Sequence, residues 1–283
     1  MSGVAADATF AENANPDLQP RQLIVTLYGL YARDERNWLS VAALVRLMSE
    51  LGVDGQAVRS SVSRLKRRDT LRSLSVAGAA GYSLSPATLE ALREGDARIF
   101  QTRRAVVADG WILVVFSVPE SERERRHELR TQLSRLGFGA AAPGVWVAPA
   151  RLAQETAKVL ARSDLDRYVE MFRGDHLGFT NLAAKVRQWW DLDELSARSA
   201  EFIARYRPVA GRLAVRAATD AEAFRHYVPM LTTWRRLPYL DPGLPLDLLP
   251  AGWTGEAATE LFAELNMQLR EPARRHAMVV IHA

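Results

Sequence analysis

Residues 111 to about 175 alternate between strand-like and helix-like patterns, and their order limits the fold more than any other feature of this 283-residue chain. WILVVFSV is a predicted strand, and SERERRHELRTQLSRLG is a predicted helix that ends at Gly137 as a C-cap glycine. GFGAAA and GVWVAP are two short predicted strands around Pro143 and Gly144. RLAQETAKVLARS is a second helix, and DRYVEMFRG is a last strand. The order β-α-β-β-α-β predicts a ferredoxin-like domain.

The segments on either side have different patterns. Residues 21–98 predict three helices and a hairpin, with Ser40 and Asp54 as the N-caps of the second and third helices. The hairpin is formed by LRSLSVAG and GYSLSP, which alternate around Gly78 and Gly81. Residues 180–283 carry the 3.6-residue helical period in NLAAKVRQWW, LDELSARSAEFIARYR, TDAEAFRHYVPMLTTWRR and GEAATELFAELNMQLRE.

The third predicted helix, in DGQAVRSSVSRLKRRDT, has a basic outer face. Val58, Val62 and Leu65 recur at i, i+4 and i+7, so this side packs inward. Residues 59–68 contain five basic residues and no acidic one. A solvated helix face normally mixes both signs to gain i,i+4 pairs. A lone basic helix of this kind is usually just solvated, but the preceding helix, the short turn and the following hairpin favour a winged helix-turn-helix that binds DNA.

Small and long polar side chains share this outer face. Serines let a helix approach a groove closely, while glutamine and arginine reach base edges. An arginine at the entry to the hairpin is placed to contact a phosphate. The predicted DNA-binding residues are Gln56, Arg59, Ser60, Ser63, Arg64, Arg67, Arg68 and Arg72.

Composition excludes several other classes of protein. The net charge is only +4, so nucleic-acid binding must come from a local patch. The chain has no cysteine, which excludes disulfides, thiolate metal sites and cysteine nucleophiles. No apolar run approaches the roughly 20 residues of a membrane helix, and the first residues lack a signal-peptide pattern. We therefore expect a cytoplasmic protein with no membrane partner.

Three groups of segments resemble the PaaX-type repressors of phenylacetic acid degradation. They are LIVTLYGLY with AVRSSVSRLKRRDTL and GYSLS, then GWILVVFSVPESERERRHELRTQLSRLGFGAAAPGVWVAP, and DPGLPLDLLPAGWTGEAATELF near the C-terminus. The resemblance implies a homodimer that represses a catabolic operon by binding operator DNA. It also implies release by an aryl-acyl-CoA effector of the phenylacetyl-CoA type.

The predicted fold class is α+β, with four segments along the chain. Residues 1–20 form a disordered tail, and residues 21–98 form the winged-helix DNA-binding domain. Residues 99–178 hold a linker helix and the ferredoxin-like middle domain. Residues 179–283 form an all-helical effector or dimerisation domain.

The middle domain also resembles the small CRISPR-associated nucleases, which place a metal-binding aspartate at the end of the first strand. Here Ser117 and Pro119 occupy that turn, and the first carboxylate is Glu120. One carboxylate does not hold Mg²⁺ as a catalytic site does. No HExxH, GxSxG, P-loop or GxGxxG motif is present. We predict no catalytic residues, no metal and no cofactor. The alternative is an acyl-CoA-binding enzyme or a nucleic-acid-processing protein built on this domain.

An acyl-CoA effector offers phosphates, an adenine ring and an apolar tail. Its site needs arginines for the phosphates and aromatic side chains for the rings. The plainer interpretation of tryptophans at helical spacing is that they belong to the core, and that His176 is an ordinary linker residue. The candidate effector-binding residues are His176, Trp189, Trp234, Arg235, Arg236 and Tyr239.

Overall fold

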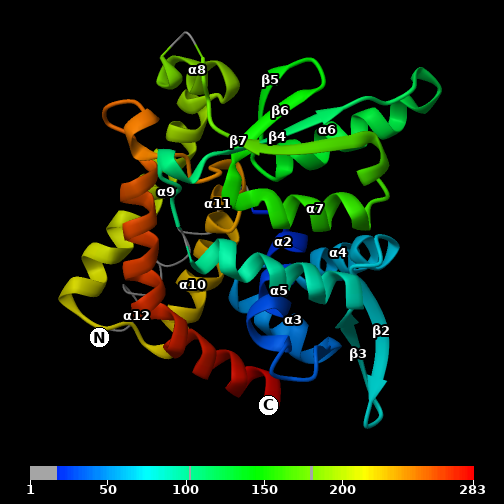
Figure 1. The fold of residues 1–283 in the computed structure, drawn as a ribbon. Coiled ribbons are helices and arrows are strands. Elements are labelled where there is room, and N and C mark those ends of the chain that lie inside the picture. Colours follow the sequence, from blue (N-terminus) through cyan, green and yellow to red (C-terminus); the bar gives the residue numbers. More distant parts are fainter. Residues whose placement is uncertain (1–17, 102, 179–180) are drawn as a thin grey trace. The chain divides into compact units, whose positions relative to one another are not determined.

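The computed structural model describes residues 18–101, 103–178 and 181–283 (Figure 1). The tail predicted at residues 1–20 lies almost wholly outside these residues. The described residues divide into two compact units. The first unit combines the residues up to Ala97 with Ala204–Trp234 and Glu260–Ala283, and the second combines Arg98–Ile203 with Arg235–Thr259. The helical last third of the chain therefore contributes to both units. The α+β class predicted from the sequence is confirmed.

The N-terminal helices of the first unit are α2 (Pro20–Leu27), α3 (Val41–Glu50) and α4 (Gly55–Arg67). A π-helical turn, Tyr28–Ala32, extends α2. The predicted cap of α3 forms, because Ser40 Oγ accepts a hydrogen bond from the Ala43 amide at 3.0 Å. Gly52 ends α3 with a φ of 76°, a left-handed conformation that favours glycine. The chain thus turns sharply between α3 and α4.

A three-stranded antiparallel sheet follows the helices, with the order β1-β3-β2. Its strands are β1 (Trp38–Ser40), β2 (Leu71–Val76) and β3 (Ala79–Leu84). The hairpin turn is Ala77-Gly78, and both residues have positive φ, as a tight two-residue turn requires. Gly81, which the sequence pattern places close to the turn, lies within β3. A Cβ there would come 2.4 Å from the Leu39 carbonyl oxygen, so glycine lets β1 pair with β3.

Two long C-terminal helices contain an interior proline. The pattern ends at residues 207 and 271, but α9 (Leu192–Val215) and α12 (Gly255–His282) contain Pro208 and Pro272. An interior proline costs a helix about 3 kcal/mol. Val209 and Ala273, the residues that follow the two prolines, are buried, and this packing offsets the loss.

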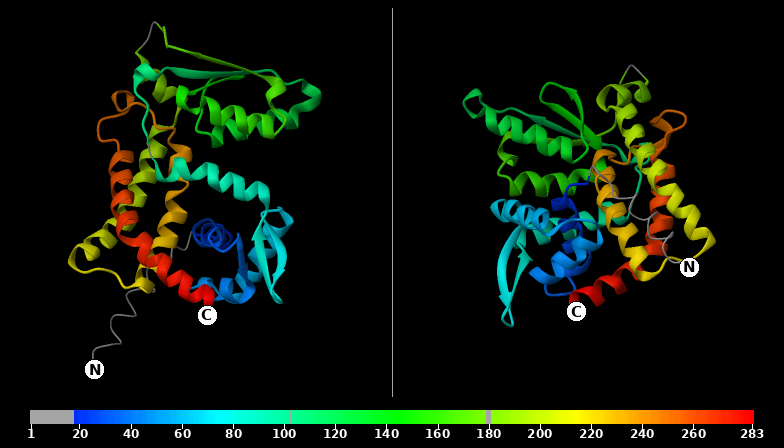
Figure 2. Two further views of the ribbon diagram at one scale, coloured as in Figure 1. Left: turned by 60° about the horizontal axis from the view of Figure 1, so that its bottom comes forward. Right: turned by 180° about the vertical axis from the view of Figure 1, so that it is seen from behind.

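The end of α12 packs against the N-terminal helices within the first unit. His276 Nε2 lies 2.6 Å from a Glu50 carboxylate oxygen, and Arg274 pairs with Asp34 at 2.9 Å. Both views in Figure 2 show this red part of α12 beside the blue N-terminal helices. The third C-terminal helix, α10 (Asp220–Trp234), contacts α2 through a buried hydrogen bond of 2.8 Å from Thr232 Oγ1 to Thr26 Oγ1. The N-terminal helices from α2 onward and the C-terminal parts of α10 and α12 therefore pack together in the first unit.

The N-terminus of α10 is capped by a reciprocal pair. The Thr219 amide donates to Glu222 at 2.8 Å, and the Glu222 amide donates back to Thr219 Oγ1 at 3.3 Å. Arg216 also holds the Glu222 carboxylate, with its nearer nitrogen at 2.7 Å. The Arg216 hydrogen bond, helped by those from Thr219, lowers the pKa of Glu222 from 4.5 to about 2.

We expect Glu222→Gln to lower the free energy of unfolding by about 1 kcal/mol at neutral pH, a value discounted because Arg216 is largely exposed. The folded pKa lies below the ordinary value, so the wild-type advantage is complete above about pH 4.5 and is lost as the pH falls toward 2. Urea denaturation at pH 7 and at pH 3 measures this change. Glu201→Gln, an exposed change on α9, is the control, and an equal loss in both variants would contradict the assignment.

The second unit contains a four-stranded antiparallel sheet with the order β5-β6-β4-β7. The elements follow one another as β4 (Trp111–Phe116), α6 (Arg123–Arg135), β5 (Gly139–Ala142), β6 (Val145–Pro149), α7 (Ala153–Arg162) and β7 (Val169–Gly174). Ile112 and Val114 of β4 pack with Leu129 of α6 and Leu160 of α7, so both helices cover one face of the sheet.

The opposite face of this sheet is partly covered by the chain that follows β7. Trp111 packs there with Val186 of α8 (Leu182–Trp189) and with Trp190. The short helix α11 (Leu237–Leu240) and the connector that holds Leu244 complete the second unit. Helix α5 (Pro86–Phe100) contributes its residues up to Ala97 to the first unit and its residues from Arg98 on to the second.

Candidate DNA interface

Helix α4 is fixed by a strong N-cap and a buried apolar stripe. The Asp54 carboxylate accepts hydrogen bonds from the amides of Gln56 at 2.8 Å and Ala57 at 2.9 Å. These two backbone donors lower the pKa of Asp54, so the cap stays ionised. Val58 and Leu65 are buried beneath the helix, as predicted. The cap and the stripe together determine which face of α4 points outward.

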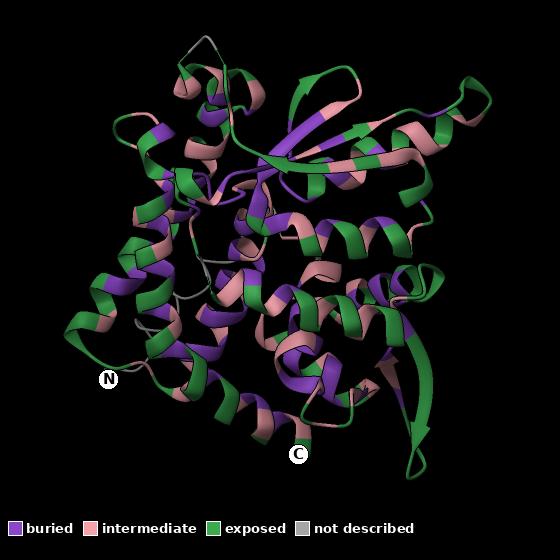
Figure 3. Ribbon diagram, in the orientation of Figure 1, coloured by how far each residue is buried: buried purple, intermediate pink, exposed green. Residues whose placement is uncertain are grey.

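Every residue predicted to bind DNA is exposed to solvent. On α4 the stripe is purple and the outer face is green in Figure 3. Ser60 and Ser63 point outward, whereas the neighbouring Ser61 is buried. Lys66, which is not among the predicted contacts, is exposed on the same helix and lies over the Tyr82 ring at 5.9 Å. The exposed set is Gln56, Arg59, Ser60, Ser63, Arg64, Arg67, Arg68 and Arg72.

The arginines of α4 and its C-cap are not held in ion pairs by the described part of the protein, although the charge of Arg59 contributes to lowering the pKa of Asp54. Arg59, Arg64, Arg67 and Arg68 form no salt bridge with any residue that the structure describes. Other exposed arginines of the same unit are paired, as Arg274 is with Asp34 and Arg275 with Asp220. Unpaired, exposed cations on one helix face attract a polyanion and gain from its neutralisation.

Arg72, at the start of β2, differs from these four residues. Its guanidinium donates two hydrogen bonds to Asp69, from Nε at 2.8 Å and from Nη2 at 2.7 Å. This pairing lowers the pKa of Asp69 and raises the pKa of Arg72. Arg72 is therefore held in one orientation at the base of the hairpin, with part of its charge already balanced.

The hairpin presents an open strand beside α4. Every residue of β2 after Leu71 is exposed, as its green ribbon in Figure 3 shows. The Trp38 indole donates a hydrogen bond of 3.0 Å to the Leu74 carbonyl oxygen, which ties β2 to the N-terminus of α3. The hairpin therefore keeps a defined position relative to α3 and α4.

The six candidate effector residues have different surroundings in the structure. In the second unit, His176 contacts Trp189 edge-on, with ring centroids 5.9 Å apart. Trp234 belongs to the first unit, where it is 2% exposed and stacks on Phe262 at 4.4 Å. It is a core residue, in agreement with the plainer interpretation.

The other three candidates lie at α11 in the second unit. Burial lowers the pKa of Arg235 to about 10. The ring of Tyr239 lies against the Arg98 guanidinium at 4.7 Å, a cation–aromatic contact inside the unit. Arg236 is exposed. Arg235 is therefore largely buried, and Tyr239 is engaged in a contact within the protein.

Among the described residues of the second unit, two hollows are large enough to hold a small ligand. One, of about 570 Å³, is lined by Trp189 and Trp190 together with Arg187, Asp191 and Asp193. The other, of about 530 Å³, is lined by Phe116, Arg126, Arg130 and Trp146 among others. None of the residues named for this second hollow is among the predicted effector residues, although the small residues in GAAAPG are a sequence signal for open space.

Within 18–101, 103–178 and 181–283, no three His, Asp or Glu side chains are grouped so that they could hold a metal ion. No helix in the part of the chain that the structure describes is long and apolar enough to span a membrane.

Three family models match successive parts of this chain. They are described as PaaX-like protein over residues 19–88, PaaX protein central Cas2-like domain over 104–186, and PaaX-like protein C-terminal domain over 190–279. The chain belongs to the PaaX family. The resemblance seen in the sequence is thereby confirmed, and the first match includes all of α3, α4 and the β2–β3 hairpin.

One curated protein and one solved structure are similar to this PaaX-family chain over most of its length. The transcriptional repressor PaaX of Escherichia coli (strain K12) is 29% identical over 280 residues, covering 96% of this chain and 87% of the relative. An uncharacterized protein of Mycobacterium tuberculosis, Rv0674, has the same fold, with a TM-score of 0.57 at 22% identity. That match covers 90% of this chain and 97% of Rv0674. Similarity to a regulator along almost the whole chain supports a regulator rather than an enzyme.

Proposed function

We propose that this PaaX-family protein is a transcriptional repressor that binds operator DNA through α4. In this proposal α3 and α4 form the helix-turn-helix, α4 is the recognition helix, and β2–β3 is the wing. The observation that carries the proposal is the exposed, unpaired arginine face of α4. The name of the relative from Escherichia coli, a transcriptional repressor, supports it.

The residues of α4 divide into two roles. Gln56, Ser60 and Ser63 are small or uncharged and lie on the outer face, where they allow close approach to base edges. The arginines grip phosphates or reach guanine, and Arg72 positions the base of the wing on the backbone. The contacts proposed are those of Gln56, Arg59, Ser60, Ser63, Arg64, Arg67, Arg68 and Arg72.

The proposed repressor acts as a homodimer in the cytoplasm. Two copies of α4 would read half-sites about one helical turn, or a multiple of it, apart. The second unit, whose strand order β5-β6-β4-β7 fits a ferredoxin-like domain, and the C-terminal helices would carry dimerisation and effector response. The operon served is one for the catabolism of an aromatic compound of the phenylacetate type.

Release from DNA is proposed to depend on an aryl-acyl-CoA of the phenylacetyl-CoA type. An effector that prefers a conformation with a different spacing of the wings lowers DNA affinity, and DNA lowers effector affinity by the same factor. A tenfold effect needs about 1.4 kcal/mol of differential binding.

Binding to labelled promoter DNA from upstream of the protein's own gene tests both parts of this proposal. We expect the protein to prefer this DNA to a scrambled duplex by at least about a thousandfold at 0.15 M salt. Phenylacetyl-CoA should raise the Kd for the promoter about tenfold or more, whereas coenzyme A and phenylacetate separately should not. Equal affinity for both duplexes would contradict the repressor, and an unchanged Kd with phenylacetyl-CoA would contradict the effector.

A further inference from the structure

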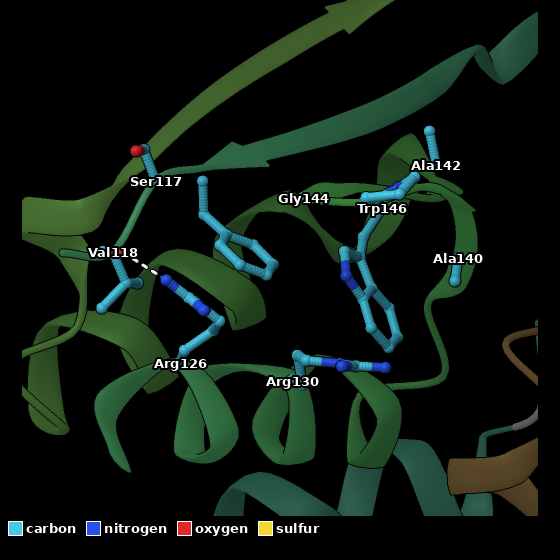
Figure 4. Close-up of a pocket in the computed structure, with 10 residues that line it drawn as sticks. Ser117, Val118, Arg126, Arg130, Ala140, Ala142, Gly144 and Trp146 are labelled. Carbon is cyan, nitrogen blue, oxygen red and sulfur yellow. Dashed lines mark hydrogen bonds between the residues drawn. The ribbon is translucent and has the colours of Figure 1, made fainter. Parts of the chain in front are cut away.

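The hollow of about 530 Å³ in the second unit lies between α6, the end of β4 and the β5–β6 hairpin. Its volume is within the roughly 300–1,000 Å³ of small-ligand pockets. Figure 4 shows Arg126 and Arg130 rising into it from α6, with the Trp146 ring reaching down toward Arg130 from the opposite side. The two cationic side chains and the indole therefore converge on one open space.

Small side chains keep this space open. Ala140, Ala142 and Pro143 line it from the β5–β6 hairpin and leave room that larger residues would fill. Gly144, with a φ of 77°, closes the hairpin, and its carbonyl oxygen accepts a hydrogen bond of 2.9 Å from the Phe116 amide. The hairpin tip is thus tied to the end of β4, and the space has a fixed wall.

Arg126 and Arg130 differ in whether the protein already occupies their hydrogen-bond donors. Arg126 is held by the Val118 carbonyl oxygen at 2.8 Å and by the exposed Glu120 carboxylate at 3.0 Å. Arg130 is exposed and has no hydrogen-bond or ion-pair partner among the described residues. Its guanidinium is therefore free to bind an anion, and a guanidinium pairs well with phosphate or carboxylate.

Trp146 provides both a ring and a donor. It is 9% exposed and packs partly in the core, so its orientation is fixed. Its indole N–H has no acceptor among the described residues. This N–H is not sealed off inside the protein, so a ligand in the hollow can reach it. A flat ring can stack or pack edge-on against Trp146 while an attached anion reaches Arg130.

The charged residues that line this hollow differ from those that line the hollow beside Trp189. That hollow is lined by Asp191 and Asp193 against a single arginine, Arg187, so its field opposes an anion. The hollow beside Trp146 is lined by two arginines and no carboxylate, with Glu120 occupied at the side of Arg126. An anionic ligand is therefore favoured at Arg130 and disfavoured at Trp189.

We propose that the hollow bounded by Phe116, Arg126, Arg130 and Trp146 binds a small ligand that carries an aromatic ring and a phosphate or carboxylate group. Arg130 binds the anion, Trp146 contacts the ring, and Arg126 positions the wall between α6 and β4. This inference builds on the proposed function, since it assigns the effector to this hollow instead of to His176, Trp189 and α11.

Calorimetric titration with phenyl phosphate, which combines a ring with an anion, tests the site. We expect saturable binding to the full-length protein, at least about tenfold tighter than binding of inorganic phosphate or benzyl alcohol. Arg130→Gln should weaken it about tenfold or more. Arg135→Gln removes the same charge from the same helix outside the hollow and should leave binding unchanged. Ala140→Met should also abolish binding, because it fills the space without altering a core residue.

Coenzyme A and phenylacetate, titrated separately, then distinguish a phosphorylated nucleotide ring from an aryl carboxylate as the source of the shared chemistry. Absence of phenyl phosphate binding at millimolar concentration, or equal binding by the wild type and Arg130→Gln, would overturn the site. Release of promoter DNA by phenylacetyl-CoA that survives Arg130→Gln would also overturn it while leaving the proposed function intact. Binding at Arg130 without any change in DNA affinity would keep the site and contradict its regulatory role.

Discussion

Replacing Arg59, Arg64 and Arg67 together by alanine should weaken binding to promoter DNA by a hundredfold or more. The three guanidinium groups are exposed on α4 and unpaired among the described residues, so their charges are available to the DNA. Removing each side chain costs about 1 kcal/mol of binding free energy or more, and about 1.4 kcal/mol corresponds to a tenfold change in Kd. The slope of log K against log salt should also become shallower by about one for each phosphate that the variant no longer neutralises. Fluorescence anisotropy over a salt series measures both quantities.

The matched control removes three arginines from another exposed helix surface in the same unit. Arg205, Arg207 and Arg212 of α9 are exposed, so their replacement by alanine changes the net charge equally. We expect at most a small fall in affinity, and little change in stability for either variant. Equal weakening of binding in both triple variants would show a general charge effect instead of a recognition helix.

Arg98→Ala should lower the free energy of unfolding of the second unit by about 3 kcal/mol or more. The Arg98 side chain is 6% exposed and joins three elements at once. It donates to the Leu136 carbonyl oxygen at 2.7 Å, to the Pro238 carbonyl oxygen at 2.9 Å and to Glu155 at 3.1 Å. Alanine leaves the buried Leu136 and Pro238 carbonyl oxygens without this donor, removes the ion pair with the half-exposed Glu155 and removes the cation–aromatic interaction with the Tyr239 ring.

Urea denaturation followed by tryptophan fluorescence is suited to this test, because five of the seven tryptophans lie in the second unit. Arg98→Lys keeps the charge but not the planar fork of donors, so it should lose most of the same stability. Arg93→Ala, an exposed change on the same helix, should stay within about 0.5 kcal/mol of the wild type. A similar unfolding midpoint for Arg98→Ala and the wild type would contradict the role given to this network.

The local patterns of the sequence predicted most of the elements because local chemistry determines them. Ser40, Asp54 and Gly137 cap helices where the sequence placed them. The helical segments visible in the sequence stop just before Pro208 and Pro272, whereas α9 and α12 continue past these prolines, because burial of neighbouring side chains outweighs a missing hydrogen bond. Such packing comes from residues far apart in the chain and leaves no trace in a local pattern.

The candidate sites differ in how well the sequence alone predicts their residues. The outer face of α4 follows from one helical period, so its exposed residues could be predicted. Because residues 59–68 hold five basic residues and no acidic one, the absence of ion pairs on this face among the described residues also agrees with the sequence. The effector candidates depended on residue type alone, and Trp234 proved to be a core residue stacked on Phe262. The hollow at Arg130 needs α6 and the β5–β6 hairpin to meet, which only the folded chain reveals.

The absence of cysteine allows the most direct test of the proposal that α4 lies against DNA. A single cysteine at Ser63 on the outer face of α4 can carry a tethered iron chelate that cuts nearby DNA. We expect Ser63→Cys to cut the bound promoter at a few discrete positions. The same reagent at Met267→Cys, a residue of α12 that is 78% exposed, should not reproduce those cuts. If the Ser63→Cys protein binds the promoter without cutting it, α4 is not the helix that enters the groove.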